Sequence, residues 1–393
     1  MAVIQTEAAT LVRTFRERFQ TDAEPEIYRA PGRVNLIGEH TDYNLGYVFP
    51  IALEMACYAA IAPRTDGQLR IVSEDFPSEM TTHIPSTLGR LTPQQDWTDY
   101  VIGVAQELLK EDIQIEGADL LIKSDVPIGS GLSSSAALEV ATAVALLRSQ
   151  ALDRLEIAKL AQRAESQFVG MPCGIMDQYA AVFGKEHAAI QIDCRSFTHE
   201  YVSLSENVVI VAVNSMVKHE LGTSAYRERV AECRAAVEAI QKIDPKVDSL
   251  RDVSPEFFVE VQEAIPPLPR QRARHVVYED ARVLEFAKAA RAHDLAEMGK
   301  LFVASHRSMQ YDYEISCEEI DFLVDTAIGL PGVYGARMTG GGFGGCTVNL
   351  LAPGSVAEFA SRLTAAYEER YSRRPVFYDC KPADGAGRVA AKA

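Results

Sequence analysis

The stretch Pro127-Ile-Gly-Ser-Gly-Leu-Ser-Ser-Ser-Ala-Ala137 decides the fold. It follows an apolar segment expected to form a strand (118–124) and opens an expected helix. Backbone amides and the positive end of the helix dipole therefore converge on one spot, which favours anions. The hydroxyls of Ser133, Ser134 and Ser135 could also bind a phosphate oxygen or a hydrated metal ion. The alternative is a flexible turn whose serines only cap the helix.

The same stretch differs from three other glycine-rich motifs. No Lys-Ser or Lys-Thr pair follows its glycines, so it is not a Walker loop, and its spacing is not that of the dinucleotide-binding GxGxxG pattern. Position 135 is serine where a nucleophile elbow requires glycine. We therefore expect a phosphate-binding loop of another kind.

A second glycine-rich segment, Gly340-Gly-Gly-Phe-Gly-Gly345, lies between expected strands at 335–338 and 346–351. A hairpin turn needs only one or two glycines, and each additional glycine costs backbone entropy. Close approach of the backbone to a ligand explains the segment better than the alternative, a mobile loop.

A third segment, residues 32–46, ends an expected short strand in a dense cluster of hydrogen-bonding side chains. These are Glu39, His40, Thr41, Asp42, Tyr43 and Asn44. Carboxylates and imidazoles share hydrogen bonds with the hydroxyls of neutral polyols, so this density favours a sugar. A charged surface loop is the alternative. A metal site is disfavoured because His40 has no histidine partner four residues away.

Asp177 lies among apolar neighbours in the segment Gly170-Met-Pro-Cys-Gly-Ile-Met-Asp177. A buried acid is costly unless it is paired, so Asp177 is expected to be functional or tied to a basic partner, for which we select Arg33. The alternative is a simple helix cap.

Composition limits the class of protein. The 393 residues predict two or three domains. Lys and Arg number 39 and Asp and Glu 55, and the resulting net charge of −16 argues against nucleic acid or an anionic membrane as the main partner. If the ligand is a polyphosphate, this acidic chain must build a locally positive site.

The N-terminus and the cysteines favour a cytoplasmic protein. Residues 1–20 predict an amphipathic helix with Leu11, Val12, Phe15 and Phe19 on one face, not a secretory signal. No window reaches the ~18 consecutive apolar residues of a membrane helix. Seven scattered cysteines without a CxxC pattern suit reduced thiols and give no metal site.

The order of strands and helices predicts two α+β domains with a boundary near residue 205. Strands are expected at 56–62, 69–73 (after a turn at Asp66-Gly67), 118–124, 187–193, 208–214, 335–338, 346–351 and 375–380. Helices are expected at 97–110 (capped by Asp96), within 131–147, and at 154–168, 225–243, 254–263, 273–292, 294–309 and 355–371. The prolines at 266, 267 and 269 predict a break between two helices, and the last dozen residues predict a loose tail.

Together these segments resemble the sugar and metabolite kinases grouped as galactokinase, homoserine kinase, mevalonate kinase and phosphomevalonate kinase (the GHMP kinases). Residues 127–137 and 340–345 look like that superfamily's second and third motifs. Residues 32–44 (GRVNLIGEHTDYN) are similar to the signature of the galactokinase family. The resemblance also includes residues 96–103, 172–178 and 337–347, in the family's order.

The resemblance implies a fold and an activity. It implies a ribosomal-S5-like N-terminal domain (1–205) with the galactose and ATP motifs, and a ferredoxin-like C-terminal domain (206–393) with the glycine-rich third motif. The active site would lie between them. It also implies ATP-dependent phosphorylation of α-D-galactose at the anomeric hydroxyl, the entry step of galactose catabolism.

The resemblance further implies roles for individual residues. Asp177 would be the catalytic base, with Arg33 as its charged neighbour. The sugar hydroxyls would be held by Glu39, His40, Asp42, Gly174 and Tyr226. The phosphates would be wrapped by Gly129, Ser130, Gly131, Leu132, Ser133 and Ser134, with Trp97 beside the adenine. Ser135 and Glu165 would hold Mg²⁺.

Other activities stay open at this stage. A galactose sensor would bind ATP and sugar without turnover, but such relatives are thought to lack the small-residue pair present here as Ser135 and Ala136. N-acetylgalactosamine, galacturonate and arabinose kinases are further alternatives. Glu39 argues against a C6 carboxylate if, as the resemblance implies, it accepts a bond from the C6 hydroxyl. We expect small-molecule partners, no nucleic acid or membrane, and a monomer or weak oligomer.

Overall fold

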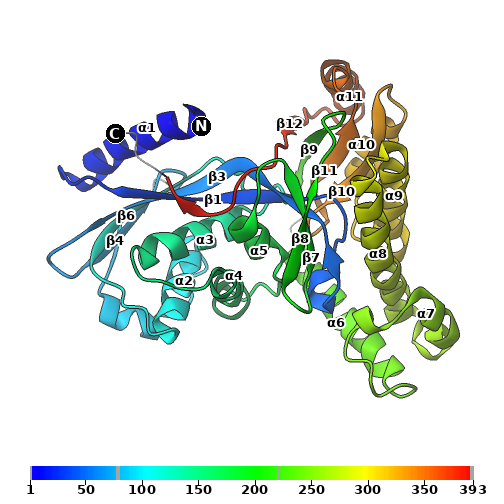
Figure 1. The fold of residues 1–393 in the computed structure, drawn as a ribbon, viewed down its shortest axis with the longest axis horizontal. Helices are drawn as coiled ribbons and strands as arrows, with labels where there is room; N and C mark the ends of the chain where they lie inside the picture. Colours follow the sequence, from blue (N-terminus) through cyan, green and yellow to red (C-terminus); the bar gives the residue numbers. More distant parts are fainter. Residues whose placement is uncertain (1, 77–79, 219–221, 390–393) are drawn as a thin grey trace.

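The computed structural model describes residues 2–76, 80–218 and 222–389, whose helices pack on three β-sheets (Figure 1). The largest sheet has the strand order β13-β1-β3-β6-β4-β5. Its strands are β1 (Glu26–Asn35), β3 (Pro50–Pro63), β4 (Leu69–Ser73), β5 (Thr81–His83), β6 (Ala118–Ser124) and β13 (Gly387–Arg388). β1 is almost entirely buried, and its last residues, 32–35, are the first residues of the 32–46 segment. The sheet therefore fixes the start of that segment.

The strands predicted at 56–62 and 69–73 are present, but they are not neighbours. β6 lies between them, antiparallel to β3 and parallel to β4. The turn at Asp66-Gly67 therefore joins two strands separated by a third, and it closes no hairpin.

Helices cover both faces of this sheet (Figure 1). One face carries α1 (Ala2–Phe19), whose Leu11, Phe15 and Phe19 are buried against the strands, as the amphipathic pattern predicts. The other face carries α2 (Thr98–Lys110), α3 (Ser134–Leu147), α4 (Arg154–Arg163) and α5 (Met176–Phe183). The helix predicted at 154–168 is α4 followed by a π-helical turn, Ala164–Val169.

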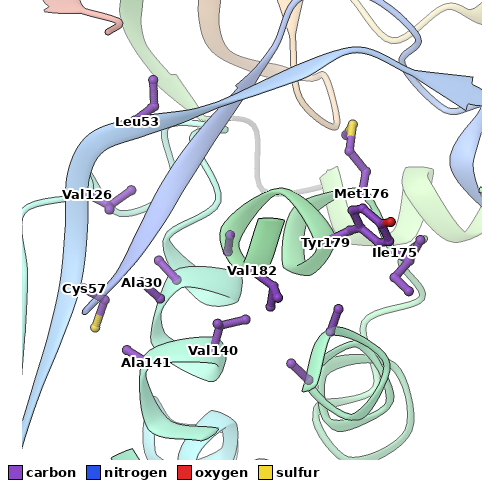
Figure 2. Close-up of a cluster of buried hydrophobic side chains, with 14 of the residues drawn as sticks. Ala30, Leu53, Cys57, Val126, Val140, Ala141, Ile175, Met176, Tyr179 and Val182 are labelled. Carbon is purple, nitrogen blue, oxygen red and sulfur yellow. The ribbon is translucent and has the colours of Figure 1, made fainter. Parts of the chain in front are cut away.

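Helix α5 is anchored in the main core. Tyr179 and Val182 belong to the same buried cluster as Val140 and Ala141 of α3 (Figure 2). α5 also contacts β1 and β3. This packing on three sides fixes the first turn of α5, which contains Asp177.

The second half of the chain builds its own antiparallel sheet in the order β10-β11-β9-β12. The strands are β9 (Val209–Lys218), β10 (Val333–Thr339), β11 (Gly344–Leu351) and β12 (Val376–Asp379). The helices of this half are α6 (Gly222–Ile240), α7 (Pro255–Val261), α8 (Pro267–Arg291), α9 (Leu295–Ser308), α10 (Glu318–Ile328) and α11 (Val356–Tyr371), of which α9, α10 and α11 pack on the sheet. A small third sheet contains β2 (Tyr47–Val48), β7 (Ala188–Asp193) and β8 (Thr198–Ser203).

Two predictions from the sequence are wrong in detail. The helix expected at 273–292 begins already at Pro267. The first turn of a helix tolerates proline, because the backbone N–H groups there have no hydrogen-bond partner within the helix, so the N–H that proline lacks is not missed. The tail is not loose over its first part. β13 pairs with β1, and the Val389 amide donates to the Ile27 carbonyl at 2.8 Å, while residues 390–393 lie outside the described part.

Three further features concern the organisation of the chain. The boundary near residue 205 stays a prediction, since β13 returns to the first sheet. All seven cysteines are free. Within the described ranges, no helix is both long and apolar enough to cross a membrane.

Candidate active site

A cavity of about 570 Å³ collects most of the residues that the sequence singles out. It is lined by residues between positions 33 and 42, the two glycine-rich loops, the segment 165–174, and the N-terminal parts of α3, α5 and α6. The predicted residues in its wall are Arg33, Glu39, His40, Asp42, Gly129, Gly131, Ser133, Ser134, Ser135, Glu165, Gly174, Asp177 and Tyr226. Segments more than 300 residues apart in the chain, from Arg33 to Gly345, therefore form one site.

The two glycine-rich loops meet backbone to backbone. A Cβ atom added to Gly340 would lie 3.1 Å from the Gly131 carbonyl oxygen, and one added to Gly345 would lie 3.0 Å from the Ser130 carbonyl oxygen. Gly131 and Gly340 also have φ angles of 82° and 88°. Only glycine combines this conformation with so close an approach. The mutual contact of the loops therefore accounts for Gly131, Gly340 and Gly345, whereas a Cβ atom on Gly342 would lie 2.5 Å from the Ile315 carbonyl oxygen.

Arg33 and Asp177 form a bidentate ion pair at the cavity wall. Arg33 Nε donates to Asp177 Oδ1 and Nη2 donates to Oδ2, each at 2.8 Å. Arg33 Nη1 donates to the Gly131 carbonyl at 2.6 Å, and the Ser133 hydroxyl donates to Asp177. The pair predicted from sequence is confirmed, and it links α5 to the first glycine-rich loop, residues 127–137.

Asp42 and Gly174 fit against each other. A Cβ atom on Gly174 would lie 2.0 Å from Asp42 Oδ2, so no other residue leaves room for this carboxylate. The Asp42 side chain accepts from the Tyr43 amide at 3.0 Å. Burial, followed by repulsion from Asp177, raises the pKa of Asp42 to about 6. Asp42 is therefore a confined carboxylate with hydrogen-bonding capacity to spare.

Glu39 is almost fully buried and is held by donors from several elements. Asn35 Nδ2 lies 2.9 Å from its Oε2, and the Gly340 amide lies 3.0 Å from its Oε1. The guanidinium of Arg337 forms an ion pair with Oε2. Burial raises the pKa of Glu39 against the opposing effect of Arg337. Glu39 connects the 32–46 segment to the second glycine-rich loop.

The His40 ring is surrounded by tyrosines. Its Nδ1 lies 2.8 Å from the Tyr43 hydroxyl, and its centroid lies 5.0 Å from that of Tyr226 on α6. Burial lowers the pKa of His40 to about 3, so the imidazole is neutral at pH 7. A neutral ring among phenols can exchange hydrogen bonds with a ligand hydroxyl without adding charge.

Glu165 lies in the π-helical turn after α4, a feature that often marks a functional position. Its carboxylate has neutral partners, with Gln178 Nε2 at 2.6 Å, Cys173 Sγ at 3.5 Å and the Ser135 hydroxyl also hydrogen-bonded to it. Burial and the nearby charge of Asp177 raise its pKa. None of these partners is a cation that would neutralise the carboxylate. The Glu165 carboxylate and the Ser135 hydroxyl are therefore suitable ligands for a hard cation.

Three predicted residues lie outside the cavity wall. The side chains of Ser130 and Leu132 are buried, with Ser130 Oγ donating to the Pro127 carbonyl at 2.7 Å. Trp97 stacks on Phe76 with ring centroids 5.7 Å apart. The structure therefore does not bring these side chains to the other site residues, and their contact with a nucleotide stays a prediction.

Several wall residues were not predicted individually. They include Tyr100, Cys173, Arg227 and Thr339. Tyr100, Cys173 and Thr339 belong to segments that the sequence marks as a group, whereas Arg227 has no signal beyond its place after Tyr226. Arg33 and Arg227 are the cationic side chains among the described wall residues, which include four carboxylates. The wall therefore carries more acidic than basic side chains, so the locally positive site that a polyphosphate requires must come from groups other than these side chains.

Comparisons with known proteins agree with this site. The family model for the GHMP kinases N terminal domain matches residues 99–185, and the GHMP kinases C terminal model matches residues 286–369. The galactokinase galactose-binding signature matches residues 13–63. The three family models therefore include the segments 127–137, 340–345 and 32–44, on which the resemblance rests.

Relatives share nearly the whole chain. A galactokinase from Roseiflexus sp. (strain RS-1) is 47% identical over 95% of this chain and 96% of its own length. A galactokinase from Homo sapiens is 43% identical over 95% of this chain and 94% of its own.

Among solved structures, Lactococcus lactis galactokinase complexed with galactose superimposes with a TM-score of 0.94 and 36% identity. The match covers 97% of this chain and 99% of that one, and it confirms the expected two-domain fold. Methanococcus jannaschii mevalonate kinase, at 18% identity and a TM-score of 0.65, shares the fold over 93% of this chain and 100% of that one. The chain therefore belongs to the galactokinase family of the GHMP kinases.

Proposed function

We propose that this protein transfers the γ-phosphoryl group of ATP to the anomeric hydroxyl of α-D-galactose, giving galactose 1-phosphate and ADP. The observation that carries the proposal is the bidentate Arg33–Asp177 pair. It lies in one cavity between an anion-binding loop and a cluster of sugar-type hydrogen-bonding groups.

Asp177 is the proton acceptor in this proposal. Its side chain keeps 26% of its exposure, so an acceptor hydroxyl can reach it from the cavity. Arg33 and Ser133 fix the carboxylate by three hydrogen bonds, which orients it toward one position in the cavity. Phosphoryl transfer depends mainly on such positioning and on nearby positive charge. Arg33 provides both, since it holds the carboxylate and places a cation beside the transferring group.

The sugar lies against Asp42, Glu39, His40 and Tyr226 in this proposal, close to Asp177. Asp42 accepts hydrogen bonds from adjacent hydroxyls, with Gly174 leaving the space for it. Glu39, His40 and Tyr226 complete the pocket. The wall thus offers carboxylate acceptors and neutral rings, a combination that suits an uncharged polyol.

The nucleotide is held mainly by backbone groups. The amides of Gly129 to Ser134 and the N-terminus of α3 face the phosphates, which is how an acidic chain can bind a polyphosphate with few cationic side chains. Ser135 and Glu165 fit a Mg²⁺ ion that accompanies ATP, because both are oxygen donors and the other partners of Glu165 are neutral. When bound, the ion would neutralise charge on the phosphate oxygens. Trp97 is proposed to lie beside the adenine.

An assay of ADP release tests the proposal. Wild-type protein is given ATP with galactose, N-acetylgalactosamine, galacturonate, glucose or arabinose, and the Asp177→Ala variant reports any contaminating kinase. We expect galactose to have the highest kcat/KM. Preference for another sugar would overturn the proposal that galactose is the substrate. Tight binding of galactose without turnover would instead identify the protein as a galactose sensor.

We further propose that the protein works in the cytoplasm as a monomer or weak oligomer, with small molecules as its partners. The seven free cysteines support a reducing compartment. Light scattering after size exclusion measures the oligomeric state, and a stable dimer at low micromolar concentration would contradict that part.

A further inference from the structure

We propose that Arg337 is a positioning residue for sugar selectivity, because it aims the Glu39 carboxylate at one hydroxyl of the bound sugar. The inference rests on the proposed function. Arg337 itself is fully buried and is not among the cavity wall residues, whereas Glu39 is. Any effect of Arg337 on the sugar must therefore pass through Glu39.

Glu39 has one hydrogen-bonding position left for a ligand. A carboxylate accepts about four hydrogen bonds. Oε2 accepts from Asn35 and Arg337, and Oε1 accepts from the Gly340 amide. The Thr339 hydroxyl lies 3.2 Å from Oε1 but 2.9 Å from the Asn35 carbonyl. Its single proton serves the shorter contact, so one lone pair of Oε1 stays available.

Arg337 fixes both the carboxylate and the chain that carries it. Its Nη1 donates to the Leu36 carbonyl at 2.7 Å, and its Nη2 pairs with Glu39 Oε2. One rigid guanidinium therefore sets the distance between the end of β1 and the Glu39 side chain. A lysine has a single ammonium on a flexible stem and cannot reproduce this fork.

Glu279 of α8 supports the arrangement from behind. It lies 3.7 Å from Arg337 Nη2 and accepts from the Gly38 amide at 3.0 Å and from Arg282 Nε at 2.7 Å. Burial acts to raise the pKa of Glu279, but Arg282 and Arg337 outweigh it and lower it to about 2. The buried Arg337 and the partly buried Arg282 thus face two buried carboxylates, and α8 anchors the Glu39 loop through both charge and backbone.

The test compares deoxy-sugar profiles. For each variant, kcat and KM are measured with galactose and with its 2-, 3-, 4- and 6-deoxy derivatives. Glu39→Gln should reduce discrimination at one carbon by about tenfold or more, because that hydroxyl loses its charged acceptor. Arg337→Lys should reduce discrimination at the same carbon, through KM rather than kcat.

Two further variants separate positioning from folding. Arg272 is a buried arginine that pairs with Glu232 and Glu314, and none of these three residues lines the cavity. Arg272→Gln is the control and should lower the melting temperature while keeping the wild-type profile. Glu279→Gln keeps the side-chain size and should shift discrimination at the same carbon as Glu39→Gln, which tests the network even if Arg337→Lys does not fold.

The outcomes are distinct. A profile for Arg337→Lys or Glu279→Gln that falls equally for all sugars would show a purely structural role and overturn the inference. An unchanged profile in Glu39→Gln would also overturn it. Wild-type protein that does not phosphorylate galactose would instead overturn the proposed function.

Discussion

The confined carboxylate of Asp42 should cost the folded protein stability at neutral pH. Its pKa is raised to about 6 from a reference of 3.8, so the folded state disfavours the ionised form. By linkage, a shift of this size costs roughly 3 kcal/mol at pH 7.5 and roughly 1 kcal/mol at pH 4.5. The cost is complete above the folded pKa and disappears as the pH falls toward the unfolded value.

Asp42→Asn removes this charge while keeping the side-chain size. The amide also loses part of the hydrogen bonding to the Tyr43 and Met176 amides, a loss that does not depend on pH. The stability of the variant relative to wild type should therefore be greater at pH 7.5 than at pH 4.5 by roughly 2 kcal/mol.

Urea unfolding of both proteins at the two pH values, without sugar, measures this difference. The variant should at the same time lose affinity for galactose in calorimetry, because the site trades stability for binding. A stability difference between variant and wild type that is the same at both pH values would refute the raised pKa of Asp42. It would also refute the account of Asp42 as a carboxylate whose confinement costs stability.

Three further predictions follow from the same geometry. Asp177→Ala should lower kcat by about 10²-fold or more, the usual scale for an acid–base group, while calorimetry still detects galactose binding; unchanged turnover would remove Asp177 from its role. Gly174→Ala places a Cβ atom 2.0 Å from Asp42 Oδ2, so the galactose KM should rise steeply with the ATP KM unchanged, and equal effects on both substrates would count against the contact. Since protonated Asp42 cannot accept two hydroxyl hydrogens, kcat/KM for galactose should fall as the pH drops through about 6. A flat profile down to pH 5 would contradict that reasoning.

Much of the site could be predicted because local chemistry marks it. The loop at 127–137 places glycines and serines directly before a helix, and the 32–46 segment gathers polar groups at the end of a buried strand. The Arg33–Asp177 pair followed from the cost of burying an unpaired acid. The first two arguments need only neighbouring residues, whereas the third uses general energetics to require a basic partner, which lies 144 residues away.

Long-range contacts could not be predicted in the same way. The glycines at 131 and 340 are required by each other, across some 200 residues, and Gly174 is required by Asp42. Neither requirement has a local signal. The position of β6 between β3 and β4, and the pairing of β13 with β1, likewise depend on tertiary contacts between distant segments. β8 was not predicted because only one of its six residues is buried, so it lacks the apolar pattern of a strand.

The identity of the phosphorylated product tests the central claim most directly. Wild-type protein is incubated with ATP and galactose, and the sugar product is analysed by phosphorus–proton correlated NMR. The account predicts a single monophosphate whose phosphorus couples to the anomeric proton, formed by Asp177→Ala about 10²-fold or more slowly. A phosphorus coupled to any other sugar proton, or no sugar phosphate from the wild-type protein, would contradict it.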